Sequence, residues 1–376
     1  MTRIVMVNLE GKIAGAERSL LLLVKYLKDE FVFSAGCPPE SPLGAVLGEM
    51  GIDCSALPAP PRRYRSLWSL PYWFRAAWRI AGIALKAKAD IIHANSFTAG
   101  AASLPAASMT RKKLIIHARD FGRGGLAMRL CTRYCEKIIA VSRAVRNHLV
   151  EQGVRPDKIE VVYNGVDENT VDARASEKTA HDSRTDGENH EFVFAQVGQL
   201  VPWKNHRFFL AAAARVAEAL PTGRFWLIGD DIFGRDSRYR TSLLGQIANS
   251  GIAKKVRLTG WQEDMRELWG GIGCLVHTAD CEPFGRVIIE AMAHKVPVIA
   301  VGGAGPSEII ESGRTGILVR AGDVEGLSEA MLRIARENEW AKNMGQAGCR
   351  RVISDFTAER TAVQMRQIYR SIAPGV

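Results

Sequence analysis

The feature that most constrains the fold is a regular alternation of short apolar runs with helical patterns along the chain. The runs are rich in β-branched residues and end near Gly, Asn, His or Asp. Continuous apolar strands that alternate with helices predict parallel sheets covered on both faces. The predicted strands are 4–7, 31–34, 91–93, 114–117, 138–141 and 161–163 in the first half, and 192–197, 225–228, 256–258, 274–277, 298–301 and 317–319 in the second.

The length of the chain indicates more than one domain. It has 376 residues, whereas a single domain usually has about 100–200. Hydrophobic residues make up 47% and charged residues 24%, which excludes a disordered, collagenous or fibrous protein. Each half has enough apolar material for a core of its own.

We therefore predict an α/β fold with two doubly wound, Rossmann-like domains. The first is expected over residues 1–167 and the second over 191–357. Between them, 168–190 is polar and is expected to be a linker or an exposed loop. Ligands of open α/β sheets bind beyond the carboxyl ends of the strands, so two such sheets facing each other predict one central cleft.

The charge of the chain is concentrated in its first half. The net charge is +10, and residues 1–165 hold 24 Lys and Arg against 13 Asp and Glu, so the surplus lies there. This half is expected to face an anionic partner such as phospholipid, nucleic acid or a phosphorylated substrate. No nucleic-acid motif supports the second of these, and no nucleic acid is expected.

Cysteine usage and hydropathy indicate a cytoplasmic location. The seven cysteines are an odd number without a Cys-x-x-Cys pair, which is typical of reduced thiols. No apolar run reaches the length of about 18 residues that spans a bilayer. Any membrane contact is expected to be peripheral, on the inner face.

The segment 281–292 carries the strongest chemical signal. It follows a predicted strand, and a helix is expected to begin near Phe284 or Gly285. First-turn amides of Gly285, Arg286 and Val287 suit a phosphate. Glu282 precedes the helix and Glu290 lies within it, so one carboxylate suits sugar hydroxyls and the other a ribose. The alternative is a pair of solvated glutamates beside an ordinary helix.

This segment resembles the Glu-x7-Glu signature of retaining glycosyltransferases of the GT-B fold, specifically glycosyltransferase family 4. Residues 197–205 resemble the family's glycine loop with its phosphate-binding lysine, and 162–167 its interdomain crossing. The stretches 140–142, 305–310 and 313–319 follow the family's order, and the resemblance covers about residues 3–370. It also implies that a helix at about 358–376 packs back on the first domain.

The resemblance implies a role for several residues. His117, Lys204 and Glu282 are the expected catalytic residues: Lys204 would neutralise the diphosphate, Glu282 would hold the sugar beside its reacting carbon, and His117 would lie near the sugar. Without the resemblance, His117 reads as a strand-end histidine with a structural hydrogen bond. The expected donor-binding set is Gly15, Gln199, Lys204, Trp261, Glu282, Phe284, Gly285, Arg286, Val287 and Glu290.

Two positions depart from the family pattern. Gln199 stands where the family commonly has Arg, so a charge is lost, and Arg286 is a candidate replacement. The first loop keeps one glycine, Gly15, where the family usually has a pair.

The implied reaction is retaining transfer of a hexose from a nucleotide sugar, with UDP-glucose or a related UDP-hexose as the expected donor. The expected acceptor is a glycan or lipid-linked saccharide in bacterial-type polysaccharide biosynthesis. No Asp-x-Asp occurs in the sequence, so no metal or other cofactor is expected. The alternatives are a nucleotide-sugar epimerase of the same fold and a non-catalytic sugar-binding scaffold.

Residues 54–89 contain no Asp or Glu and are rich in Arg, Lys, Trp and Tyr. After a helix start at Ser69 and Pro71, the residues Phe74, Trp78, Ala81 and Leu85 are predicted to share one face. Such a segment suits an anionic membrane interface, and the alternative is a core helix with a solvated basic face. The expected membrane or acceptor surface consists of Arg75, Trp78, Arg79 and Lys86.

Overall fold

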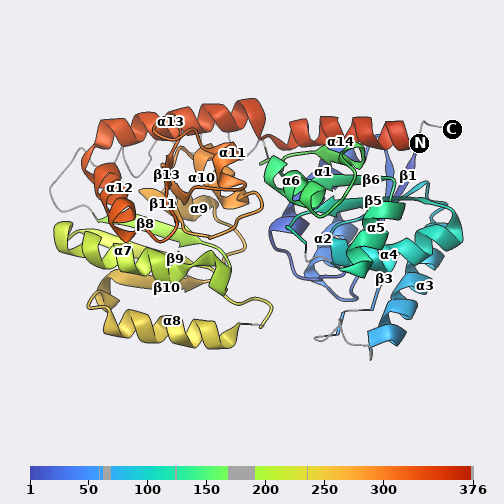
Figure 1. Ribbon diagram of the computed structural model, residues 1–376, viewed down its shortest axis with the longest axis horizontal. Coiled ribbons are helices and arrows are strands. Elements are labelled where there is room, and N and C mark those ends of the chain that lie inside the picture. Colours follow the sequence, from blue (N-terminus) through green and yellow to red (C-terminus); the bar gives the residue numbers. More distant parts are fainter. Residues whose placement is uncertain (59, 62–68, 123–124, 168–190, 235, 374–376) are drawn as a thin grey trace. The chain divides into compact units, whose positions relative to one another are not determined.

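The computed structural model describes the chain except residues 59, 62–68, 123–124, 168–190, 235 and 374–376. The chain divides into two compact units (Figure 1), Met1–Gly165 with Ala358–Val376 and Val166–Thr357. The first crossing lies two residues before the expected boundary at 167, because Val166 pairs with Thr357 in a parallel β-bridge. The expected linker 168–190 lies outside the described residues.

The first unit contains a seven-stranded parallel sheet in the order β3-β2-β1-β4-β5-β6-β7. The order reverses between β1 and β4, which is the switch point where such sheets bind ligands. The strands are β1 Arg3–Val7, β2 Val32–Cys37, β3 Asp53–Ala56, β4 Ile91–Ala94, β5 Lys113–Ala118, β6 Lys137–Ala140 and β7 Ile159–Val161.

Helices cover both faces of this sheet. On one face α1 and α14 pack side by side, and on the other α3, α4 and α5 follow one another (Figure 1). The core beneath α1 and α14 includes Leu20, Met365 and Tyr369. The helices are α1 Gly15–Leu27, α2 Pro42–Glu49, α3 Leu70–Lys86, α4 Phe97–Thr110, α5 Leu126–Tyr134, α6 Arg143–Glu151 and α14 Ala358–Ile372.

The second unit contains a six-stranded parallel sheet in the order β10-β9-β8-β11-β12-β13, with its switch point between β8 and β11. Its central strands β8, β11 and β12 are almost completely buried, as a sheet covered on both faces requires, whereas the edge strands β10 and β13 are only partly buried. The strands are β8 Phe192–Val197, β9 Gly223–Ile228, β10 Val256–Gly260, β11 Cys274–His277, β12 Val298–Val301 and β13 Ile317–Val319.

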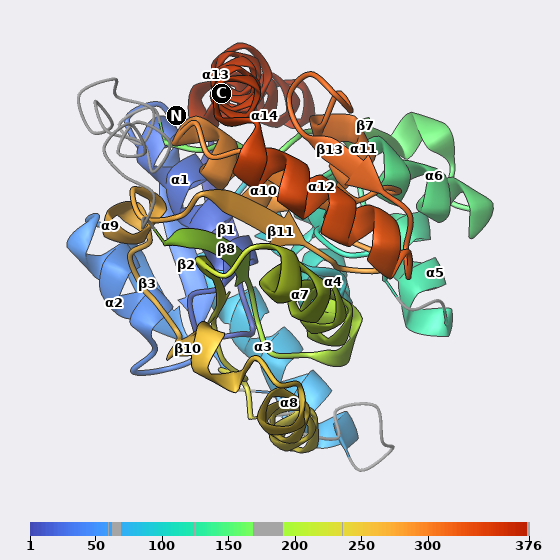
Figure 2. The ribbon, with the colours of Figure 1, turned by 90° about the vertical axis from the view of Figure 1, so that its left-hand side faces the viewer.

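Helices α7 and α12 lie side by side over one face of the second sheet (Figure 2). Their core contains the stacked rings of Phe194 and Phe225, 5.8 Å apart between centroids. On the other face α10 packs against α13. The helices are α7 His206–Ala219, α8 Ser237–Asn249, α9 Arg266–Trp269, α10 Arg286–Ala293, α11 Pro306–Ile309, α12 Val324–Arg336 and α13 Asn338–Asp355.

The two doubly wound sheets confirm the predicted fold class. Strand β3 was not predicted, because its sequence Asp-Cys-Ser-Ala lacks an apolar run. Strand β7 lies two residues before the predicted 161–163.

Candidate active site

The candidate site of the second unit is built by the loops that follow β8 and β11. These strands flank the switch point, and open α/β sheets bind their ligands beyond the carboxyl ends of such strands. The loop after β8 ends in a short 3-10 turn, Pro202–Lys204, and the loop after β11 carries Glu282. Two residues separated by 78 positions in the sequence are thereby brought together.

Lys204 and Glu282 form an ion pair through Nζ and Oε2, with side chains only 13% and 11% exposed. His277, the last residue of β11, places Nε2 at 3.1 Å from the same carboxylate oxygen. The Lys204 ammonium also lies 4.2 Å from the centre of the Trp203 ring. A cation, a carboxylate and an imidazole therefore meet at the carboxyl edge of the sheet.

The ionisation of this cluster follows from burial and charge. Burial acts to raise the pKa of Glu282, but Lys204 and His277 together outweigh it and hold that pKa at about 2. Burial lowers the pKa of His277, and the nearby Lys204 lowers it further, whereas Glu282 acts in the opposite direction. At neutral pH the site therefore contains an ionised carboxylate and a neutral imidazole.

A second layer of polar contacts fixes the backbone that carries Lys204. The side chain of Gln196, in β8, donates to the Lys204 carbonyl at 2.7 Å and to Thr278 Oγ1 at 2.8 Å. Thr278 in turn bonds the carbonyls of Lys204 and Asn205 at 3.1 and 3.0 Å. The lysine is thus positioned by its main chain as well as by its ion pair.

The segment from Glu282 to Gly285 contains several of the expected donor-binding residues, so we call it the donor loop, and Gly305 holds it in place. The Gly305 amide donates to the Glu282 carbonyl at 3.0 Å. A Cβ on Gly305 would lie 2.3 Å from the Phe284 Cα, so no other residue fits there without a shift of the loop. Gly285 has φ +103°, a left-handed conformation that favours glycine. Helix α10 therefore begins at Arg286, just after the predicted start.

The remaining donor-binding candidates of this unit lie around the same edge. Glu290 accepts a hydrogen bond from Arg286 Nη2 at 2.9 Å, within the first two turns of α10. Val287 lies in the first turn of that helix, and Gln199 in the loop after β8. Trp261 follows β10 at the outer edge of the sheet, two strands from β8.

His117 belongs to the first unit, where it is one of two buried, stacked histidines. Its ring centroid lies 5.5 Å from that of His93, and Arg119 Nη2 lies 3.4 Å from its Nδ1. Burial lowers the pKa of His117 well below its usual value, and the charge of Arg119 adds to this effect. Arg119 also donates to Asn95 and Asn164 at 2.7 and 3.0 Å.

Gly15 is the first residue of α1, in the loop that follows β1. The helix start is closed by Glu17, whose carboxylate accepts from the Ala14 amide at 3.1 Å. Burial raises the pKa of Glu17, while backbone hydrogen bonds at Glu17 and Ala14 and the charge of Arg119 oppose that rise. This loop is therefore held from within the first unit.

Helix α3 differs from the predicted arrangement of faces. Phe74, Trp78 and Leu85 are 69%, 65% and 60% exposed, whereas Ala81, expected to share their face, is buried. The buried side of α3 is instead rich in alanine and packs against α4. Arg75, Arg79 and Lys86 are also exposed. The aromatic and basic side chains thus share one exposed surface. Arg62, Arg63, Arg65, Tyr64 and Trp68 lie outside the described residues.

Several residues of both sites were not singled out from the sequence. His277, Thr278 and Gln196 support Lys204 and Glu282, and His93 and Arg119 surround His117. Their signal is a polar side chain within or just after a buried apolar strand, which would be costly unless it were hydrogen-bonded. Among the described residues no cluster of three or more His, Cys, Asp or Glu is arranged to hold a metal ion. None of the helices described is long and apolar enough to cross a membrane.

Two family models match nearly the whole chain between them. Residues 13–170 match "Glycosyltransferase Family 4", and residues 178–351 match "Glycosyl transferases group 1". The chain thus has the fold and the matched segments of a GT-B glycosyltransferase. It belongs to the family 4 type of these enzymes.

Three individual relatives each share less than 30% sequence identity with this chain. The lipopolysaccharide core biosynthesis glycosyltransferase LpsE of Rhizobium meliloti is 29% identical, over 44% of this chain and less than half (46%) of that protein. The UDP-Gal:alpha-D-GlcNAc-diphosphoundecaprenol alpha-1,3-galactosyltransferase of Escherichia coli is 22% identical over 76% of each chain. The crystal structure of Anabaena HepE with UDP-glucose has a TM-score of 0.85 at 23% identity, over 99% of this chain and 100% of that one.

Proposed function

We propose that this glycosyltransferase moves a hexose from a UDP-hexose, such as UDP-glucose, to a glycan or lipid-linked saccharide, with retention of the anomeric configuration. The observation that carries the proposal is the buried Lys204–Glu282 pair with His277 at the switch point of the second sheet. It places one cation and one ionised carboxylate in the crevice where open α/β sheets bind nucleotides.

Lys204 is proposed to stabilise the leaving diphosphate. Breaking the bond between sugar and diphosphate places negative charge on the leaving oxygen, and a preorganised cation in a dry site offsets it. The Lys204 ammonium is paired with Glu282. A diphosphate bound beside Glu282 would be a second anionic partner of that ammonium.

Glu282 is proposed to hold hydroxyl groups of the donor sugar. Its pKa of about 2 keeps it ionised at neutral pH, and an ionised carboxylate accepts hydrogen bonds but cannot donate them. The sugar would thus be oriented by its own O–H groups. Retention is proposed to follow from attack on the face from which the diphosphate leaves.

The amino end of α10 is proposed to receive the phosphates and the ribose. Gly285 allows close approach because it has no Cβ, and the first-turn amides of a helix favour an anion. Glu290 would accept from the ribose hydroxyls. Arg286, which is paired with Glu290, would supply part of the charge that Gln199 lacks.

His117 and the loop at Gly15 are proposed to contribute from the first unit. The His117 ring is neutral, and its Nε2 is buried with no hydrogen-bond partner among the described residues. A sugar hydroxyl would satisfy that nitrogen. Trp261, Phe284 and Val287 complete the proposed donor contacts, with Trp261 beside the base.

The relatives support the choice of donor and acceptor. HepE was crystallised with UDP-glucose, and the name of the E. coli enzyme gives UDP-Gal as donor and a diphosphoundecaprenol-linked sugar as acceptor. We also propose that no metal or other cofactor is required. Lys204 and the amides of α10 would take the electrostatic role that a metal held by Asp-x-Asp takes elsewhere.

A lipid-linked acceptor is further supported by the exposed surface of α3. Phe74 and Trp78 stack on each other at 6.3 Å and lie beside Arg75, Arg79 and Lys86, which suits an interface with anionic lipid. Sedimentation with vesicles containing phosphatidylglycerol tests this surface. Binding should be lost in Arg75→Glu/Arg79→Glu and in Trp78→Ala. No binding by the parent protein would remove the membrane from the proposal.

The nucleotide is tested by thermal melting with UDP, GDP or ADP. At about 100 times its dissociation constant, a ligand stabilises by about 2.7 kcal/mol, so UDP should raise the Tm and the other two should raise it less. Glu290→Ala should weaken the UDP effect, whereas Glu329→Ala, on α12, is a matched control. Equal shifts with all three nucleotides would refute the choice of UDP.

A further inference from the structure

The chain passes between the two units twice, and each crossing is tied to the other. In the second unit the Val166 amide donates to the Phe356 carbonyl at 2.9 Å, and Val166 pairs with Thr357. In the first unit Thr361 Oγ1 donates to the Tyr163 carbonyl at 2.8 Å. These few residues therefore fix the backbone on either side of both chain crossings.

Phe356 connects this crossing to the donor loop. Its ring is buried and meets the ring of Phe284 edge to face, at 6.0 Å between centroids and 65° between planes. Phe284 lies between Glu282 and Gly285, and it too is buried. The residue whose carbonyl holds Val166 thus has its ring against the loop that is proposed to bind the donor.

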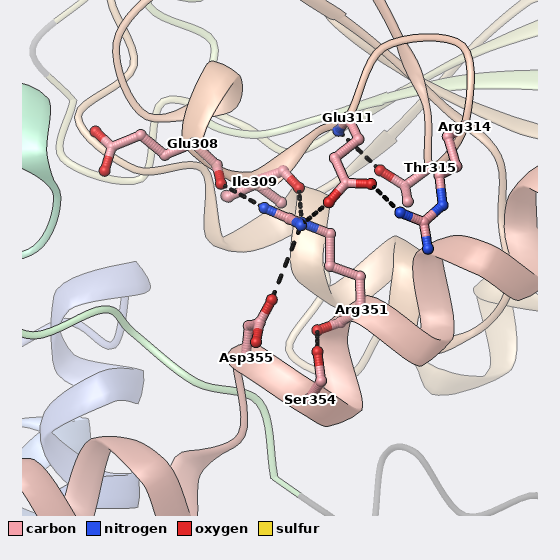
Figure 3. Close-up of polar contacts among 8 residues, drawn as sticks. All are labelled: Glu308, Ile309, Glu311, Arg314, Thr315, Arg351, Ser354 and Asp355. Carbon is pink, nitrogen blue, oxygen red and sulfur yellow. Dashed lines mark hydrogen bonds and ion pairs between the residues drawn. The ribbon is translucent and has the colours of Figure 1, made fainter.

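A second connection runs through Gly305, α11 and Arg351. Gly305 is packed against the Phe284 main chain, and α11 begins at the next residue. At the other end of α11, Arg351 donates to the carbonyls of Ile309 and Glu308 at 2.6 and 3.1 Å and pairs with Glu311. Figure 3 shows the guanidinium reaching from α13 to these carbonyls, while the Glu308 side chain points away from it.

This second connection also reaches Phe356, because Arg351 lies close to its ring. Its guanidinium carbon lies 5.8 Å from the centre of the Phe356 ring, and Asp355, next to Phe356, lies 3.9 Å from its Nη1. The planar fork of Arg satisfies two carbonyls and a carboxylate at once, which a Lys ammonium does not reproduce. Both connections from the donor loop therefore end at the carboxyl end of α13.

We infer that Arg351 and Phe356 are positioning residues that couple occupation of the donor loop to the two chain crossings. The inference depends on the proposed function, because it requires that the donor binds at the loop 282–285. Close-packed side chains transmit displacement instead of absorbing it, so a shift of Phe284 is passed to the ring and carbonyl of Phe356. The coupling would pass donor binding in the second unit on to the two segments that connect the units.

Hydrogen exchange of the Val166 amide, with and without UDP, measures this coupling directly. In the parent protein, UDP should slow that exchange by about ten-fold, because the bond to Phe356 is held more firmly. In Phe356→Leu and in Arg351→Met the slowing should disappear. The affinity for UDP should stay within about three-fold, since neither side chain is proposed to touch the nucleotide.

The values of kcat and KM distinguish a positioning role of these residues from a general loss of structure. Both variants should lose about ten-fold in kcat for transfer from UDP-hexose, with KM within about three-fold of the parent. Arg350→Met is the matched control, because this exposed arginine is the neighbour of Arg351 on the same helix. It should behave as the parent does. Arg351→Lys keeps the charge but not the fork, so it should behave as Arg351→Met does.

Each result bears on a distinct claim. If UDP binds the parent protein but leaves Val166 exchange unchanged, the coupling is wrong and the proposed function stands. If UDP does not bind the folded parent, both are wrong. If Phe356→Leu does not fold, the two Arg351 variants decide. Equal loss in Arg350→Met and Arg351→Met would also overturn the inference, because the effect would then come from charge alone.

Discussion

Replacement of Lys204 by Met should destabilise the second unit, because it leaves the buried Glu282 carboxylate without its cation. The pair is nearly buried, at 13% and 11% exposure of the two side chains. Burial acts to raise the pKa of Glu282, and Lys204 is the main group that opposes it. The interval from the ordinary value of 4.5 to about 2 corresponds to about 3 kcal/mol.

This magnitude agrees with the cost of removing one partner of a buried ion pair, about 3–5 kcal/mol. For a unit of about this size, Tm shifts by about 2–4 °C per kcal/mol. Lys204→Met should therefore lower the melting temperature of the second unit by roughly 6–12 °C at pH 7. Adding Glu282→Gln should recover part of the loss, because the uncompensated charge is then gone.

The control is a cation removed from the surface of the same unit. Arg215 lies 3.7 Å from Glu325, and their side chains are 54% and 71% exposed. Such pairs contribute about 0–1 kcal/mol, so Arg215→Met should shift Tm by little. The pKa of Glu282 is depressed in the folded state, so its stabilisation is complete above about pH 4.5 and is lost as the pH falls toward about 2. Equal Tm shifts in Lys204→Met and Arg215→Met would refute the reasoning.

Two further predictions concern the packing around each site. Burial lowers the pKa of His93 to about 3, whereas an unfolded chain binds that proton near pH 6.5. The contribution of neutral His93 to the free energy of unfolding is therefore complete above pH 6.5 and is lost as the pH falls toward about 3. In urea unfolding at pH 5–7, His93→Gln should flatten the pH dependence by up to about 1.4 kcal/mol per pH unit, and an unchanged slope would contradict the assignment. Gly305→Ala should weaken UDP binding by more than about ten-fold, because a Cβ meets the Phe284 main chain. In Gly245→Ala a Cβ would meet nothing within 4 Å. Titration calorimetry compares the two, and equal affinities would mean that the donor loop does not bind the nucleotide.

Most strands could be predicted from the sequence because a buried parallel strand must be continuously apolar. The segments 192–197, 274–277, 298–301 and 317–319 have the predicted bounds in the structure. Strand β3 could not be predicted in this way, because an edge strand is only partly buried and its sequence is polar. Its place is set by pairing with β2 instead.

Helical periodicity alone did not predict which face of α3 is buried. Large apolar residues at helical spacing favour a buried face, yet Phe74 and Trp78 are exposed. The partner helix α4 presents Gly100, Ala106 and other small residues. A helix packs closely on such a surface through alanines, so the small side of α3 became the buried one.

The approach of Lys204 to Glu282 was implied by a family resemblance, and their positions after strands at a switch point explain it. Their supports His277 and Gln196 carried a weaker signal, as polar residues in buried strands. Arg351 carried little signal beyond its spacing to Asp355, because its partners Glu308, Ile309 and Glu311 are about forty residues away and two of them offer only main-chain carbonyls. Contacts of that kind leave no pattern in the sequence.

The most direct test of the account is the release of UDP from UDP-glucose in EDTA, with and without a saccharide acceptor, by the parent protein and by Lys204→Ala. The account predicts metal-free turnover by the parent. It predicts a loss of about 100-fold or more in Lys204→Ala, since one preorganised charge contact is removed. Turnover by Lys204→Ala at the parent rate, or strict dependence of the parent on a divalent metal, would contradict it.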